Sequence, residues 1–119
     1  KKSKPIVICS LYRPPCSKAI KDTGRYTQYL SSCFENLPKG SEVFILGDFN
    51  VDMSKKNNLS SLISELCKSK VLTEHVSSTT RVTEYSSTMI DLAISKNNLA
   101  EDCSVVYIGI SDHSLVFLR

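Results

Sequence analysis

Short β-branched apolar runs alternate with segments of helical periodicity along this chain, and that alternation limits the folds open to it. Runs of this kind are typical of buried strands, and they lie at residues 5–11, 42–46, 88–95, 103–108 and 114–118, with a sixth candidate at 71–76. Apolar residues three and four positions apart indicate one helix each over 26–37 and 59–67. This order predicts a sheet layered with helices, in the α/β or mixed α/β class.

The length and composition indicate one small globular domain. The chain has 119 residues, of which 41% are hydrophobic and 23% are charged, as in packed rather than disordered proteins. Residues 77–87 are dense in Ser and Thr and are expected to form a long surface loop. No apolar run is long enough to span a bilayer, so no membrane partner is expected. Because the first residue is Lys1 rather than Met, we expect a piece of a longer polypeptide.

The cysteines indicate the redox environment. The chain has five cysteines and no C-x-x-C pair. Four of them fall within apolar patterns, where cysteine behaves as a small buried hydrophobe; these are Cys9, Cys33, Cys67 and Cys103. We therefore expect reduced thiols in an intracellular protein, without a zinc site or a disulfide framework.

The net charge of +3 permits a polyanionic partner without demanding one. Lys55 and Lys56 are the best local candidates for contacting a phosphate backbone. A solvated loop is the alternative interpretation of this pair.

Three polar motifs stand at the ends of apolar runs. They are Gly47-Asp48-Phe49-Asn50, Met89-Ile90-Asp91-Leu92 and Ser111-Asp112-His113-Ser114. Acids, an amide and an imidazole converging on one phosphate are the groups that metal-assisted phosphodiester hydrolysis uses. The sequence therefore points to one site assembled from three separate segments.

Asp48 and Asn50 follow the run at 42–46 directly. In an extended chain, residues two apart point to the same side, so the carboxylate and the amide are expected to arrive together. The carboxylate would orient or deprotonate a water, and the amide would donate a hydrogen bond to a phosphate oxygen. A simple turn is the alternative, because Gly, Asp and Asn are common turn formers.

Asp91 interrupts an apolar run, where an unpaired charge is costly to bury. We therefore expect a partner, and His113 is the candidate because a carboxylate can fix the tautomer of an imidazole. The alternative is an Asp on the solvent face of an edge strand.

Two further candidates are weaker by themselves. Asp112 could bind a metal ion or its water, whereas a surface Asp-His pair is the alternative for Asp112 and His113. The hydroxyl of Tyr12, which follows the first run, could hold a phosphate oxygen, or the ring could pack on the sheet edge. His75 stands in a polar stretch and is expected at the surface.

Taken together, the motifs resemble those of the endonuclease/exonuclease/phosphatase superfamily, and most closely the apurinic-type endonuclease domain of non-LTR (LINE-like) retrotransposons. Five pieces carry the resemblance in order over nearly the whole chain, at residues 12–15, 47–50, 80–81, 87–92 and 111–114. The resemblance assigns residues 1–119 to this domain.

The resemblance implies a four-layered α/β sandwich of the DNase I-like kind, of which this chain is the C-terminal portion. It also implies nicking of DNA with Mg²⁺ as the cofactor, or Mn²⁺ as an alternative, in a polyprotein with a covalently linked reverse transcriptase that acts in the nucleus.

The resemblance also implies roles for the site residues. Asp48 would be the acid/base that transfers the proton, and Asn50 would position Asp48 at the phosphate. Asp91 would orient His113. His113 would stabilise the transition state. Asp112 would help to place the metal, and Tyr12 would contact the scissile phosphate.

The chain departs from the family at its front. Family members carry an earlier strand with an Asn and another with a Glu that is the main metal ligand, and residues 1–11 hold no Asp, Glu, Asn or Gln. The N-terminal part of the domain is therefore expected to be missing. A catalytically inactive remnant is one alternative function, and a phosphodiesterase of the same superfamily with another phosphoester substrate is a second.

Overall fold

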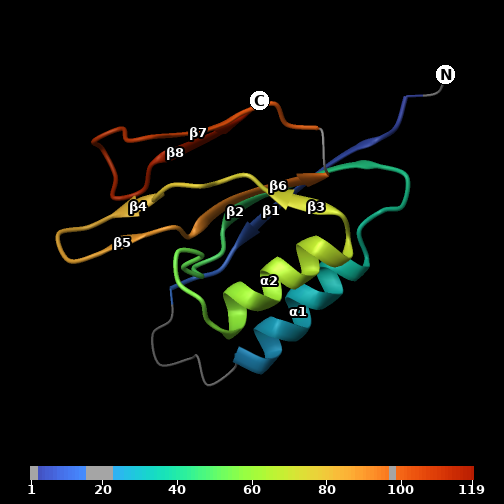
Figure 1. Cartoon of the computed structure of the whole chain (residues 1–119), viewed down its shortest axis with the longest axis horizontal. Helices are drawn as coiled ribbons and strands as arrows, with labels where there is room; N and C mark the ends of the chain where they lie inside the picture. Colours follow the sequence, from blue (N-terminus) through green and yellow to red (C-terminus); the bar gives the residue numbers. More distant parts are fainter. Residues whose placement is uncertain (1–2, 16–22, 97–98) are drawn as a thin grey trace.

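A four-stranded sheet covered on one face by two helices forms the body of the molecule (Figure 1). The computed structural model describes residues 3–15, 23–96 and 99–119. The strand order in this sheet is β1 (Ile6–Tyr12), β2 (Glu42–Asp48), β6 (Asp91–Lys96) and β3 (Leu72–Glu74). The helices are α1 (Thr23–Glu35) and α2 (Asn58–Ser69). Strands β1 and β2 are parallel, whereas β6 runs antiparallel to both of its neighbours.

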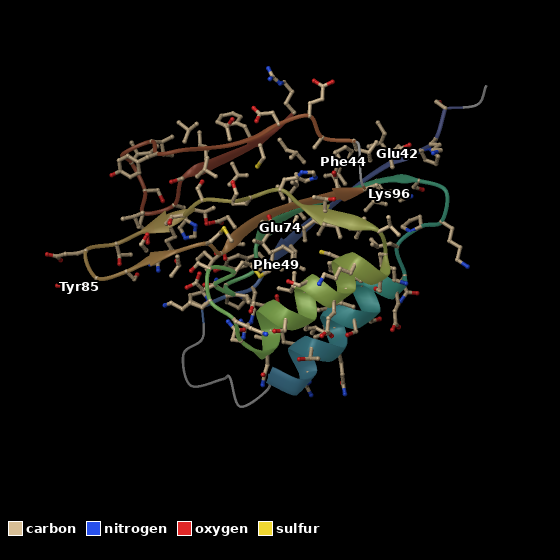
Figure 2. All side chains as sticks on the ribbon, in the orientation of Figure 1. Glu42, Phe44, Phe49, Glu74, Tyr85 and Lys96 are labelled. Carbon is tan, nitrogen blue, oxygen red and sulfur yellow. The ribbon has the colours of Figure 1, made fainter. Side chains whose placement is uncertain are left out.

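Two small sheets complete the described part of the chain. Strands β4 (Arg81–Val82) and β5 (Ser87–Thr88) form a hairpin that projects from the body, and Tyr85 stands at its tip (Figures 1 and 2). Strands β7 (Cys103–Val106) and β8 (Leu115–Leu118) form a second pair that lies on the side of the main sheet opposite the helices. The predicted class of mixed sheets and helices is therefore confirmed.

The hydrophobic core lies between the main sheet and the two helices. Its buried residues come from both helices, from the strands of the sheet and from the segment after β2. They are Leu30, Phe34, Val43, Ile45, Phe49, Val51, Ile63, Cys67, Leu72, Leu92 and Ile94. Both helices present an apolar face to this core, which explains why these amphipathic segments are helical. Tyr29 and Cys33 were expected on that face of α1 and are instead exposed.

Strand β1 packs only one of its two faces against the core, although its sequence is apolar on both. Alternate residues of β1 pack against the core, whereas Ile6 and Ile8 are 68% and 70% exposed. The expectation of a fully buried strand was wrong here, because side chains alternate between the two faces of a strand and the helices cover only one face.

The segment at 77–87 is more ordered than a surface loop. It contains β4 and leads into β5, and Thr80 within it is completely buried. The strand expected at 88–95 begins only at Asp91, because Thr88 pairs with Arg81 in the hairpin instead. The segment lies mostly at the surface as expected, but it forms a hairpin anchored by a buried residue rather than an irregular loop.

The cysteines and the helices bear on the expected thiols and on membrane insertion. Four of the cysteines lie in the described residues and are free thiols, and Cys16 lies outside those residues. Neither of the described helices is long and apolar enough to cross a bilayer.

Glu74 makes the stability of the fold depend on pH. Burial raises the pKa of this carboxyl to about 7, although its Oε1 accepts a hydrogen bond of 2.7 Å from the Val76 N–H. Because the folded-state pKa lies above the ordinary value, protonation favours folding. This contribution is fully present below pH 4.5 and is lost as the pH rises through about 7.

We expect Glu74→Gln to remove this dependence and to raise the free energy of unfolding at pH 8 by about 1–2 kcal/mol, after allowance for partial exposure. Urea unfolding of both proteins between pH 4 and 8 measures the effect. A parent protein whose stability did not fall over this range would contradict the assignment.

Candidate active site

Three titratable side chains from distant segments meet at one end of the main sheet. Asp48 ends β2 and is the direct cross-strand partner of Asp91, the first residue of β6. His113 joins them from the segment that leads into β8. One ligand atom of each of these three residues lies within 4.8 Å of the others.

The contact expected between Asp91 and His113 is confirmed. The Asp91 Oδ2 and the His113 Nδ1 lie 2.9 Å apart. Their side chains are only 19% and 33% exposed, so the carboxylate acts on the ring in a partly desolvated setting. A carboxylate in this position favours a proton on Nδ1 of the ring.

Asp48 and Asn50 also come together, but not through extended backbone. The Asn50 N–H donates to Asp48 Oδ1 at 2.8 Å, and the Asn50 Nδ2 donates to Asp48 Oδ2 at 3.1 Å. Asn50 has a φ of 47°, in the left-handed region that Asn tolerates better than most residues. The expected extended geometry was therefore wrong. A tight turn holds both side chains, so the two interpretations of this motif are compatible.

The electrostatics of Asp48 reflect its neighbours. Burial and the negative charge of Asp91 raise the pKa of Asp48, although the Asn50 N–H and the charges of His113 and Arg81 act in the opposite direction. The carboxyl therefore holds a proton more readily than an ordinary exposed Asp.

Tyr12 and Asp112 lie at the margin of this group. Tyr12 is the in-register partner of Asp48 at the end of β1, and its side chain is 69% exposed. Asp112 is not part of the three-residue group, because its Oδ2 lies 2.7 Å from Arg81 Nη2 in an exposed ion pair. The structure thus brings Asp48, Asn50, Asp91 and His113 together and pairs Asp112 with an arginine.

The surface position expected for His75 was wrong. His75 is half-buried, and its Nε2 lies 2.8 Å from the Ser95 Oγ. Burial also lowers the pKa of His75. This histidine is a structural partner of β6 rather than a member of the site.

Thr80 positions the site, and sequence reasoning assigned it no role. Its Oγ1 accepts hydrogen bonds from the N–H groups of Ile90 and Asp91, at 3.1 and 3.0 Å. Its carbonyl accepts the N–H of Ser114 at 2.7 Å. One buried residue therefore fixes the backbone at Asp91 and next to His113. The available signal was its place in the pair at 80–81, which carries part of the family resemblance within a segment expected to be a surface loop.

We expect Thr80→Val to lower the free energy of unfolding by about 2–3 kcal/mol, because it leaves two N–H groups without their acceptor at unchanged volume. Thr80→Ser is the matched control, since it keeps the oxygen and loses one methyl group, which costs about 1 kcal/mol. Urea unfolding ranks the two variants. Equal losses would show that packing, rather than the hydroxyl, matters at this position.

Arg13 supports the turn that holds Asn50. The Arg13 guanidinium stacks over the Tyr26 ring at 4.3 Å, and its Nη1 donates to the Asn50 carbonyl at 3.1 Å. The Arg13 carbonyl in turn accepts from Asn50 Nδ2. Arg13 thus stabilises the left-handed turn, a role that its place in the motif after Tyr12 did not reveal.

The donor set suits a divalent cation. Mg²⁺ and Mn²⁺ prefer oxygen ligands, and Mg²⁺ commonly takes one or two carboxylates while keeping waters or substrate oxygens. Asp48 and Asp91 offer two carboxylates that lie directly opposite each other on β2 and β6. Each ionised carboxylate keeps lone pairs beyond those used in the hydrogen bonds described above. The carboxylate pair and His113 together could hold such an ion.

A comparison with protein families agrees with this chemistry. A family model described as "Endonuclease-reverse transcriptase" matches residues 6–117. No curated protein matches the chain.

Proposed function

Because the chain belongs to the endonuclease-reverse transcriptase family of the endonuclease/exonuclease/phosphatase superfamily, we propose that it is the metal-dependent, DNA-nicking part of a retrotransposon polyprotein. The convergence of Asp48, Asp91 and His113 at one end of the sheet is the observation that supports this proposal best. A reverse transcriptase on the same polypeptide and action on nuclear DNA are parts of the proposal.

The proposal extends to the fold. Residues 1–119 would be part of a four-layered DNase I-like sandwich. The β7–β8 pair on the far side of the main sheet would contribute to its second sheet. The exposed Ile6 and Ile8 on that far side support a further layer, since apolar side chains in a row gain from burial.

In the proposed reaction, a water attacks the scissile phosphorus, the bond to the leaving oxygen breaks, and that oxygen takes up a proton from solvent. Asp48 orients this water and takes its proton, and the Asn50 amide positions Asp48 at the phosphate. His113, aligned by Asp91, takes part in this step as the imidazolium, and its Nε2–H donates a hydrogen bond to the phosphoryl oxygen on which negative charge grows.

Two other residues complete the proposed site. Tyr12 directs its hydroxyl to a phosphate oxygen, as its exposed position beside Asp48 allows. Asp112 would help to place the cation once its carboxylate leaves Arg81. When bound, a divalent cation would supply Lewis-acid stabilisation of the phosphoryl oxygen and lower the pKa of a ligated water.

Nicking of supercoiled plasmid tests the function. The assay uses this chain and the polypeptide extended upstream to include the Asn and Glu strands of the family. We expect nicking with Mg²⁺ or Mn²⁺ that EDTA abolishes, and Asp48→Ala should lose it. Activity of the extended form alone would identify the upstream segment as part of the metal site. No nicking by either folded protein would instead favour an inactive remnant or another phosphoester substrate.

A further inference from the structure

A basic hollow of about 520 Å³ lies between the segment that follows Asn50 and one face of helix α2. Its lining is polar and is made of hydroxyl and charged side chains with one methionine: Met53, Ser54, Lys55, Lys56, Ser60, Ser61, Ser64, Glu65 and Lys68. This face of α2 is opposite the one that packs into the core. Met53 and Ser60 also contribute to packing and capping, but the three lysines and Glu65 are exposed, so the hollow opens on the surface.

The charge of this hollow favours an anion. Three lysines line it against one acid, Glu65. The Lys55 Nζ lies 3.5 Å from Asp52 Oδ2, but the Lys55 side chain is 75% exposed, so this pair leaves the ammonium open to a second anion. The polar lining disfavours an apolar ligand.

The hollow is rigidly connected to the candidate active site. The Met53 N–H donates to the Met89 carbonyl at 2.9 Å, and Asp52 Oδ1 accepts the Met89 N–H at 3.1 Å. Met89 lies two residues before Asp91, so these bonds fix the wall of the hollow relative to the acidic group. In Figure 1 the loop after β2 lies at the same end of the sheet as the β4–β5 hairpin.

The start of helix α2 does not itself provide the site. A capping box occupies it, in which the Asn57 side chain accepts the Ser60 N–H and Ser60 Oγ accepts the Asn57 N–H. The lysine ammonium groups, rather than free helix N–H groups, are left to recognise the anion.

We propose that Lys55, Lys56 and Lys68 form a subsite for backbone phosphates of duplex DNA, flanking the point of cleavage. The inference rests on the proposed function, which places the same DNA at the acidic group. Because the contacts are to phosphates, this subsite adds affinity and register without sequence preference.

Salt-dependent binding of a fluorescent DNA duplex, measured by anisotropy in EDTA, tests the subsite. We expect the triple variant Lys55→Gln, Lys56→Gln and Lys68→Gln to bind about tenfold or more weakly. The slope of log Kobs against log salt should fall by about 2–3, close to one for each lost phosphate contact. The matched control changes Lys4, Lys39 and Lys70 to Gln, which removes the same charge from lysines outside the hollow, and should leave the slope nearly unchanged.

Three outcomes would overturn the subsite: an unchanged triple variant, equal losses in both triple variants, or a parent chain without salt-dependent DNA binding. The measurement is independent of catalysis because EDTA removes the metal. A parent that nicks plasmid while the triple variant binds normally would refute the subsite alone. Selective loss of binding in the triple variant, with no nicking by this chain or by the extended polypeptide, would support the subsite and refute the nuclease.

Discussion

Gly47→Ala should unfold the protein or come close to it, with a loss of more than about 4 kcal/mol in the free energy of unfolding. Gly47 has a φ of 144°, which L side chains rarely adopt. A Cβ at this position would lie 2.8 Å from the Leu11 carbonyl carbon and still closer to its oxygen. The new methyl group would force β1 away from β2, and small domains have only about 5–15 kcal/mol to lose.

Circular dichroism and urea unfolding measure this loss. Gly24→Ala is the matched control, because Gly24 lies in α1 and a Cβ there meets nothing within 4 Å. That variant should gain about 0.5–1 kcal/mol, since Ala has less backbone entropy to lose in a helix. A Gly47→Ala protein of near-normal stability would mean that β1 and β2 do not approach each other as described.

His113→Gln should reduce metal-dependent nicking by about 10²–10⁴-fold, the range expected for a lost acid–base or charge-stabilising group. Gln keeps a polar side chain of similar reach but cannot carry the charge that the Asp91 carboxylate stabilises. The stability of the variant should change by only about 1 kcal/mol, because the His113 side chain is partly exposed. Plasmid nicking, by the form of the protein that is active, measures the loss of activity. Urea unfolding measures the change in stability.

The second histidine provides the control for this experiment. The chain has two histidines, and His75 is hydrogen-bonded to Ser95 outside the acidic group. We expect His75→Gln to retain nicking within a few-fold. Comparable loss in both variants would indicate general damage to the fold, and full activity of His113→Gln would refute its proposed role.

Much of the fold was predictable because its signals are local. The apolar periodicities of 26–37 and 59–67 anticipated α1 and α2, and the run at 42–46 anticipated β2. The pairing of Asp91 with His113 was also predictable, because an acid inside an apolar run needs a partner and His113 stands in a polar motif at the end of another such run.

Other features depended on contacts that no local pattern encodes. Thr80 is buried because it accepts two N–H groups from the start of β6, although its neighbours in sequence resemble a solvated loop. Asp112 pairs with Arg81 rather than with the acidic group because β4 runs beside the His113 segment.

By itself, the sequence determined the order of strands and helices and the chemical groups available at the ends of the apolar runs, because periodicity and residue type act over a few neighbouring residues. Only the tertiary structure decided which of these groups meet and in what backbone conformation. Asp48, Asp91 and His113 converge because β2 and β6 pair in one register. A shift of that register by one residue would turn each side chain to the other face.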